Sequence, residues 1–430
     1  MSDKAFSEQI CHDFIGPQAR ILVGRDRGRG GDGLIERTVP MLGTALGVML
    51  VSVLGASAFL PSVVAASLFW THVGAAAVSV IAIGSPSVRP TIFPFLVVVL
   101  YLVPGVIVAQ DLDLAFVGWT NTALGVVAGS TLGWMLAYGR EAARISSVLA
   151  AVIVALSVLI LLDWFVYRTT SGHEFKLAWG RSNYVSAVLV VGGLLSSSQM
   201  MRFGRTKSGL AVLGISSFAS LLVLSRGSTL ALIVGLGVIG VGSIRSAWLR
   251  LVAVVFLAPV MLNASLAVLE RVSLERGLAS TDARSQNVEI RFELWKSSFQ
   301  SFRDNPIVGS GFGGLRSMSV TPAGLQFSHA HNFVLSFIQQ AGLFALPFLT
   351  LMIAVWVSGF RRGSIFERAA LCSLLVIALV EPFFEGLVGA IVATALLVVS
   401  ARHRSSCQLG NAATAVLAEH QMNRSEEAGS

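Results

Sequence analysis

The chain has 430 residues, of which 54% are hydrophobic and only 13% are charged. Soluble domains carry about 25% charged residues, so the composition excludes an ordinary soluble protein and predicts a membrane protein. The first apolar run begins near Val39, after a polar stretch, and we therefore do not expect a cleavable signal peptide. A net charge of +8 is also common in proteins that bind nucleic acid, but these basic residues are distributed as membrane orientation requires, and we expect no nucleic-acid partner.

Twelve apolar runs along the chain are candidate membrane spans, because a helix crosses a bilayer with roughly 20 apolar residues. The stretch 209–244 is too long for one span, and Ser225-Arg226-Gly227 interrupts it, which predicts a tight hairpin. The predicted fold class is an all-α polytopic membrane protein with about twelve transmembrane helices. The runs are residues 39–60, 63–84, 91–108, 115–138, 146–166, 183–200, 209–224, 228–244, 249–267, 332–357, 369–385 and 386–401.

Lysine and arginine in the connections predict the orientation of these helices, because cytoplasmic loops carry an excess of both. With the amino terminus inside, twenty basic residues fall in inside segments and four fall in the short outside loops. The four are Arg168, Lys176, Arg181 and Arg226. We therefore expect both ends of the chain in the cytoplasm.

This orientation divides the chain into five segments, of which one is a long external connection between the ninth and tenth helices. The connection is polar, and its stretch from Glu289 to Phe302 has a helical pattern. The segments are a cytoplasmic tail (1–38), helices one to nine (39–267), the external loop (268–331), helices ten to twelve (332–401) and a second cytoplasmic tail (402–430).

Two of the four polar features on the predicted outer face contain an arginine. Arg226 occupies a minimal turn between two apolar helices, where an arginine must snorkel, pair or bind a ligand. An interfacial anchor is the alternative. Arg291 and Trp295 lie four residues apart and share one face of a helix, and a surface cation–π contact between them is the alternative.

The other two features are a glycine-rich segment and a pair of histidines. Asn305-Pro-Ile-Val-Gly-Ser-Gly-Phe-Gly-Gly314 permits an irregular backbone, but no strand precedes it and it lacks the ending of a nucleotide-binding loop. His329 and His331 have no cysteine or carboxylate cluster beside them to complete a zinc site. A histidine at the mouth of a helix bundle suits work as a general base better, and a polar loop end is the alternative.

Together these features resemble the bacterial O-antigen ligase and polysaccharide polymerase superfamily. The resemblance rests on the Ser225-Arg226-Gly227 turn and on Arg291-x-x-x-Trp295 followed by Asn-Pro-Ile-x-Gly-x-Gly. It also rests on His331-Asn332, which opens a predicted transmembrane helix. Many helices, one long late external loop and a few closing helices fit the order of the family.

Further matches extend the resemblance over residues 179–345. Nine residues separate the His-Asn pair from Gly342, which is similar to the spacing in the family. Ala345 stands where a second glycine is often seen, and this departure weakens assignment to the ligase branch. Trp179-Gly-Arg-Ser-Asn183 resembles the short glycine–asparagine motif of the family.

The resemblance implies a membrane glycosyltransferase that takes a glycan from undecaprenyl diphosphate and passes it to a hydroxyl of an acceptor sugar. The donor is already activated, so no nucleotide, metal or other cofactor is expected. The partners would be the lipid-linked donor, a glycan or lipid-linked acceptor and the lipid bilayer. The site would face outward from the bacterial inner (cytoplasmic) membrane, with the chain acting as ligase or polymerase.

The resemblance also implies roles for individual residues. Arg226 and Arg291 would hold the diphosphate, since a guanidinium binds phosphate through two hydrogen bonds. His331 would accept the proton of the acceptor hydroxyl or orient that hydroxyl. The expected substrate-binding residues are Trp179, Arg181, Asn183, Trp295, Gly311 and Asn332, and lesser candidates are Arg303, Arg316, Glu381 and Glu385.

A transporter or flippase of lipid-linked saccharides is the main alternative from another functional class. Facilitators with twelve helices carry their longest loop centrally and inside, whereas here the long loop is late and external. Charged residues within the spans are also few, although many ion-coupled carriers use them. A structural membrane subunit is a third class, which would not require several polar motifs on one face.

Overall fold

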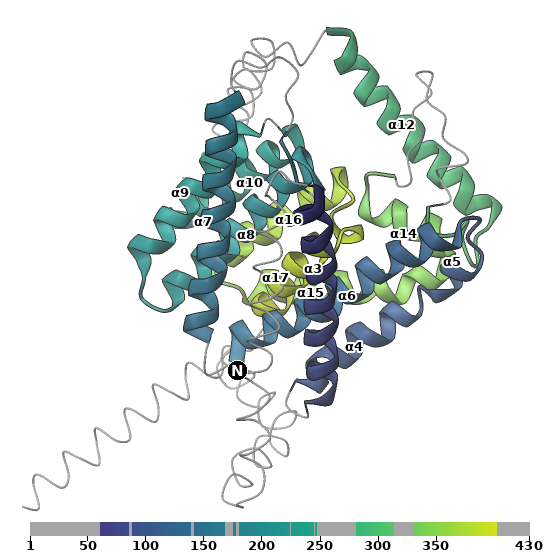
Figure 1. Ribbon diagram of the computed structural model, residues 1–430, viewed down its shortest axis with the longest axis horizontal. Coiled ribbons are helices and arrows are strands. Elements are labelled where there is room, and N and C mark those ends of the chain that lie inside the picture. The colour runs from purple at the N-terminus through teal and green to yellow at the C-terminus, as the bar shows by residue number, and fades with distance from the viewer. Residues whose placement is uncertain are drawn as a thin grey trace, which may run out of the picture.

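The structure, a computed structural model, describes residues 61–85, 88–138, 142–167, 175–177, 180–223, 225–244, 246, 281–313 and 330–401. These residues are helical almost throughout (Figure 1). The helices are α3 (Pro61–Gly84), α4 (Arg89–Leu100), α5 (Val103–Ile107), α6 (Leu112–Tyr138), α7 (Ala142–Tyr167), α8 (Ser182–Arg202), α9 (Thr206–Leu222), α10 (Arg226–Ser243), α12 (Thr281–Asp304), α14 (Phe333–Ala341), α15 (Leu346–Arg362), α16 (Ile365–Val380) and α17 (Leu387–Ala401). Two short 3₁₀ helices, η1 (Gly342–Ala345) and η2 (Phe383–Glu385), and one two-residue hairpin, β1 (Lys176–Leu177) with β2 (Gly180–Arg181), complete it. The predicted all-α class is confirmed for this part of the chain.

Six of the described helices are long and apolar enough to cross a membrane. Helices α9 and α17 are apolar but shorter. The predicted runs 39–60 and 249–267 lie outside the described residues, so the count of about twelve spans stays a prediction. The six helices are Arg89–Ile107, Leu112–Tyr138, Ala142–Tyr167, Asn183–Arg202, Arg226–Ser243 and Phe333–Arg362.

The predicted span 332–357 is not one regular helix. It begins as α14, passes through η1 and continues as α15 to Arg362. The break falls at Gly342, whose φ of 58° is open to glycine and strained for other residues. The run 91–108 is likewise divided into α4 and α5, and Pro104 stands in the first turn of α5.

The predicted span 369–385 ends earlier than expected. Helix α16 stops at Val380, and Pro382 follows two residues later in a position where it cannot continue the helix. Glu381 and Glu385 therefore lie on the connection between α16 and α17, outside the helical spans. Glu381 follows α16 directly and Glu385 is the last residue of η2, so both lie near the outer end of the eleventh predicted helix but not within α16.

Helix α17 is the most buried helix of the bundle, and all of its side chains from Leu387 to Ser400 are buried. It packs against α6 along Gly125, Gly129 and Gly133, which lie one turn apart on one face. A Cβ atom built on Gly129 would lie 2.5 Å from the carbonyl oxygen of Ile391, so only glycine allows this approach. Close backbone contact through small residues is how helices associate without a hydrophobic driving force.

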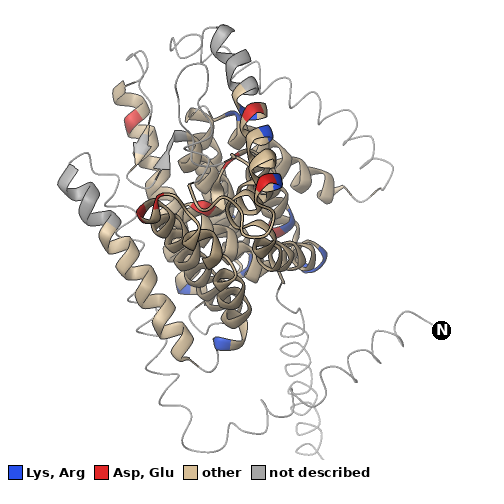
Figure 2. Ribbon diagram, turned by 90° about the vertical axis from the view of Figure 1, so that its right-hand side faces the viewer, with Lys and Arg blue, Asp and Glu red and all other residues tan. Residues whose placement is uncertain are grey.

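The outside of the bundle is apolar. Large side chains such as Phe69, Phe93, Phe116 and Phe165 are each more than half exposed on the peripheral helices α3, α4, α6 and α7. Figure 2 shows long stretches of helix without a charged residue. Exposed apolar surface of this extent is typical of contact with lipid rather than water, and the chain is a membrane protein.

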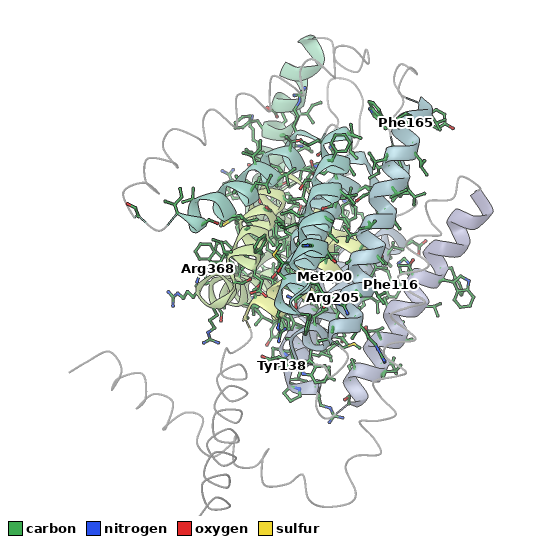
Figure 3. The ribbon with its side chains drawn as sticks, turned by 90° about the vertical axis from the view of Figure 1, so that its left-hand side faces the viewer. Phe116, Tyr138, Phe165, Met200, Arg205 and Arg368 are labelled. Atoms are coloured by element: carbon green, nitrogen blue, oxygen red, sulfur yellow. The ribbon has the colours of Figure 1, made fainter. Side chains whose placement is uncertain are left out.

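The bundle has two distinct ends. At one end, Arg202 donates to the carbonyl oxygens of Leu136 and Ala137 at 2.9 and 3.0 Å, and Arg205 donates to the hydroxyl of Ser147 at 2.6 Å. These contacts join the end of α6 to the end of α8, and the start of α7 to the N-cap residue of α9. Figure 3 shows Tyr138 and Arg205 toward this lower end and Phe165 at the upper end. The upper end carries α12 (Figure 1).

Candidate functional site

The carboxyl end of α16 is the point where the predicted site residues meet. The last carbonyl groups of a helix have no partner within that helix. Here Arg291 Nη1 donates to the Val380 carbonyl oxygen at 2.7 Å, and Asn332 Nδ2 donates to the Leu379 carbonyl oxygen at 3.3 Å. Side chains from α12 and from the start of α14 therefore complete the end of α16.

Glu381, directly after α16, lies between two of the predicted catalytic residues. Its side chain is only 5% exposed. Its Oε1 lies 3.2 Å from Arg291 Nη2, and its Oε2 lies 3.5 Å from His331 Nδ1. One buried carboxylate thus links an arginine and a histidine that are forty residues apart in the sequence, while both remain partly exposed to solvent, by 32% and 21% of their side chains.

His331 is held in an unusual backbone conformation. Its φ of 51° is the only positive φ of a non-glycine residue in the described part of the chain. Such a conformation costs about 1–3 kcal/mol and is enriched at active sites. Asn332 fixes the following turn, because its side chain accepts from Leu335 N at 3.1 Å as the N-cap of α14, and the Ala330 amide donates to the Ser336 hydroxyl at 3.1 Å. The direction of the imidazole is therefore set by local structure.

The turn that carries Arg226 lies against the same connection. Ser225 caps α10 by accepting from Ser228 N at 3.4 Å, which accounts for the predicted tight turn. Gly227 packs so closely that a Cβ atom on it would lie 2.9 Å from Val380 Cγ2 and 3.7 Å from Glu381 Oε1. Arg226 itself is exposed to solvent. Its turn therefore adjoins the carboxylate that holds Arg291 and His331.

The start of α8 is the fourth element at this end. The Ser228 hydroxyl donates to the Asn183 carbonyl oxygen at 3.3 Å, which ties the start of α10 to the start of α8. The side chain of Asn183 is exposed. Trp179 and the side chain of Arg181 lie outside the described residues, as does His329.

The glycine-rich segment supports the break in the tenth predicted helix. Gly309 and Gly311 have φ values of 73° and 88°, and the Gly311 amide donates to the Gln340 carbonyl oxygen at 3.1 Å. A Cβ atom on Gly342 would lie 2.5 Å from the Ile307 carbonyl oxygen. Gly311 is buried against Ala109, so the segment closes over the end of α14 rather than lying beside Glu381.

Trp295 lies one turn after Arg291 on α12 and is partly buried. Its ring contacts Phe292 edge to face, with centroids 5.6 Å apart. Its indole Nε1 is shielded from solvent and has no hydrogen-bond partner among the described residues. Arg291 points its guanidinium at Val380 and Glu381, which is the contact that the sequence did not predict.

A second carboxyl group, that of Glu385, stands beside the first in a different environment. Gln340 Nε2 donates to its Oε2 at 3.2 Å. Burial raises the pKa of the Glu385 carboxyl to about 7, and the hydrogen bonds with Ser336 and Gln340 and the nearby His331 offset part of this rise. Glu381 has an arginine partner, whereas the hydrogen-bond partners of Glu385 are the neutral side chains of Ser336 and Gln340. No group of three or more His, Cys, Asp or Glu in the described ranges has an arrangement that would hold a metal ion.

Sequence reasoning underestimated Glu381, which it treated as a lesser candidate. The available signal was a glutamate followed by a proline at the end of an apolar run. An ionisable residue within a predicted membrane span, as Glu381 is within 369–385, is rare enough to merit a functional interpretation. Its partners, however, come from residues 50 and 90 positions earlier, and only the fold brings these together.

The fold and the site define an all-helical membrane protein with a cluster of arginine, histidine and glutamate at one end of the bundle. The family model described as O-antigen ligase matches residues 211–350, which include Arg226, Arg291 and His331. The match supports membership of the chain in the O-antigen ligase superfamily, as the motifs predict. No curated protein matches the chain.

Proposed function

We propose that the chain is a membrane glycosyltransferase that transfers or polymerises a glycan from undecaprenyl diphosphate onto a hydroxyl of an acceptor sugar. Membership of the O-antigen ligase superfamily supports a glycan-transferring membrane enzyme of this kind. The observation that carries the proposal is that Arg291 and His331 share the buried carboxylate of Glu381, beside the turn that presents Arg226.

Arg226 and Arg291 bind the diphosphate of the donor. The leaving group carries at least two negative charges. Further negative charge develops on the departing oxygen as the glycosidic bond breaks. Guanidinium groups stay charged and offer two parallel donors to phosphate. Fixed cations placed where charge develops lower the barrier of such a step. Arg226 is exposed and Arg291 is partly exposed, so both are accessible to a ligand.

His331 accepts the proton of the acceptor hydroxyl. The hydroxyl oxygen attacks the anomeric carbon, the bond from that carbon to the diphosphate breaks, and undecaprenyl diphosphate leaves with the electron pair. The proton passes to the imidazole and then to solvent. A positioned general base typically contributes about 10²–10⁴-fold to such a step.

The remaining predicted residues line the path of the substrates. Asn183, with Trp179 and Arg181 before it, belongs to the start of α8 beside the turn of Arg226. Trp295 offers an aromatic face and a shielded indole N–H on α12. Asn332 stabilises the backbone next to His331, and Gly311 stabilises the end of α14. We therefore assign both residues a supporting role in substrate binding.

We further propose a chain of about twelve spans with both ends in the cytoplasm and the site facing outward. The segments are the tail 1–38, the spans 39–267, the external loop 268–331, the spans 332–401 and the tail 402–430. The arginines at the opposite end of the bundle support this orientation in the bacterial inner membrane. A reporter that is active only outside the cytoplasm should be active when fused near Ser319 and silent near Gly204, and the reverse pattern would overturn it.

The direct test of the function uses purified protein, a synthetic undecaprenyl diphosphate glycan and an acceptor glycan. Product should form without added nucleotide and in the presence of a chelator. Failure of the wild-type protein to form product with any of the lipid-linked acceptors or surface-anchor acceptors would refute the proposed reaction. The acceptor that is used distinguishes a polymerase from a ligase.

A further inference from the structure

We propose that Glu381 is a positioning residue of the transfer reaction, which holds the guanidinium of Arg291 and the imidazole of His331 in their working arrangement. The inference rests on the proposed function. It concerns a residue that lies outside residues 211–350, the part of the chain matched by the family model.

The place of Glu381 is unfavourable for a carboxylate unless something compensates it. Its backbone amide donates to the Ile377 carbonyl oxygen at 2.7 Å, so it caps the carboxyl end of α16. That end of a helix carries a partial negative charge and stabilises cations rather than anions. The side chain is also nearly fully buried, and burying a charge is costly without partners. Arg291 and His331 compensate both effects.

Stability alone is a weak reason for this arrangement. Replacing a buried ion pair by apolar residues is often neutral or stabilising, because desolvation offsets the attraction between the charges. The two partners, Arg291 and His331, are also two of the three residues to which the sequence motifs assign chemistry. A carboxylate that links both of them is better explained by what it does to their geometry.

Each oxygen of Glu381 serves one partner. With Oε2 beside Nδ1 of His331 at 3.5 Å, the carboxylate favours the tautomer that carries its proton on Nδ1. Nε2 is then the unprotonated nitrogen, which is the one that accepts a proton from a hydroxyl. This is the role of the acidic member in catalytic triads, which orients the histidine without taking the proton itself.

Arg291 does not depend on Glu381 alone for its position. Its Nη1 donates to the Val380 carbonyl oxygen at 2.7 Å, and that bond survives loss of the carboxylate. Removal of Glu381 would therefore leave Arg291 docked while deleting a negative charge next to the diphosphate. We expect the donor to bind at least as tightly as to the wild type. The rate of catalysis should fall, because His331 is no longer held in the tautomer with its proton on Nδ1. General damage to the fold would weaken both.

The test measures kcat and donor KM for purified Glu381→Gln and Glu381→Asp in the transfer assay. For Glu381→Gln we expect kcat to fall on the order of 10²-fold, with a donor KM equal to or below that of the wild type. Glu381→Asp keeps the charge and should recover part of the lost kcat. Glu367→Gln makes the same change at the other end of α16, and should alter thermal stability without altering kcat.

Three results would overturn the inference. They are an unchanged kcat in Glu381→Gln, a donor KM that rises as far as kcat falls, and a Glu381→Asp variant no more active than Glu381→Gln. If Glu381→Gln does not fold, Glu381→Asp tests the inference instead. Because it keeps the negative charge, it should fold and should have the donor KM of the wild type. Glu367→Gln serves as the control in this comparison as well. A wild-type protein without activity would instead refute the proposed function, so the two failures are distinguishable.

Discussion

Helix α16 carries a buried glutamate at each end, and the two are held in opposite ways. Glu367, at the amino end, accepts from the Ser364 amide at 2.7 Å and from Gln199 Nε2 at 3.3 Å, within a capping box. A negative charge there agrees with the helix dipole. Glu381, at the carboxyl end, opposes the dipole and relies on Arg291 and His331.

The difference shows at which end of the bundle the helix terminus accounts for the buried charge. At the Glu367 end, charged side chains complete helix termini, as Glu367 does for α16 and Arg202 does for α6. At the Glu381 end, a charge is placed where the helix disfavours it, and its partners come from other elements. We therefore expect substitutions at the Glu381 end to affect turnover, and substitutions at the Glu367 end to affect stability.

The largest expected effect is that of removing the imidazole of His331. Asparagine tolerates the left-handed backbone at this position, so His331→Asn removes the base without adding strain. We expect transfer to fall by about 10²–10⁴-fold, and His331→Ala to abolish it. His329→Ala should be tolerated, because only His331 belongs to the His-Asn pair. Full activity of His331→Asn in the purified transfer assay would contradict this role.

The second prediction concerns the two arginines. Arg226→Ala and Arg291→Ala should each lower turnover on the order of 10²-fold, as expected when a donor to developing charge is lost. Arg226→Lys keeps the charge but loses the planar fork, and should still be impaired. Near-normal surface glycan from a normally expressed double variant, Arg226→Ala with Arg291→Ala, would remove both residues from the site.

The third prediction tests the opposite end. Glu367→Ala leaves the Ser364 amide and Gln199 without their acceptor, and should lower the free energy of unfolding by about 1–3 kcal/mol. The turnover of the folded fraction should not change, since Glu367 lies at the far end of α16 from Arg291 and His331. Thermal unfolding in detergent and the transfer assay measure the two quantities. A loss of turnover at unchanged stability would break the comparison between the ends.

The fourth prediction is a pH dependence of stability through Glu385. Burial raises the pKa of its carboxyl from 4.5 to about 7. Between these values the unfolded state loses the proton first, so stability is full below about pH 4.5 and falls as pH rises through about 7. Glu385→Gln mimics the neutral carboxyl and should remove this fall. An equal pH dependence of the unfolding midpoint in both proteins would contradict the assignment.

The sequence predicted the all-α class and the apolar helices of the described part of the chain. Apolar runs identify the spans because a helix in contact with lipid needs apolar side chains. The turn at Arg226 was predicted from three residues alone. The break at Gly342 was not predicted, because the residues that require it, such as Ile307 and Gly309, lie more than thirty positions earlier. Pro382 indicates the early end of α16, but a prediction from hydrophobicity alone does not take this proline into account.

The partners of the site residues were beyond sequence reasoning for a physical reason. Charge pairing depends on distances of a few ångström, and Glu381 reaches Arg291 and His331 only through the packing of α12 and α14 onto the end of α16. The pattern identified Arg291 and Trp295 as neighbours on one helix face. It did not reveal that the guanidinium of Arg291 binds Val380 and Glu381.

The most direct test of the central claim follows the lipid-linked glycan in cells that carry His331→Ala. If the protein is a transferase at the outer face, the substrate is made and flipped normally but not consumed. Unused undecaprenyl diphosphate glycan should then accumulate on the outer leaflet, where an impermeant reagent labels it. Accumulation on the inner leaflet would instead identify a flippase defect and contradict the proposed reaction.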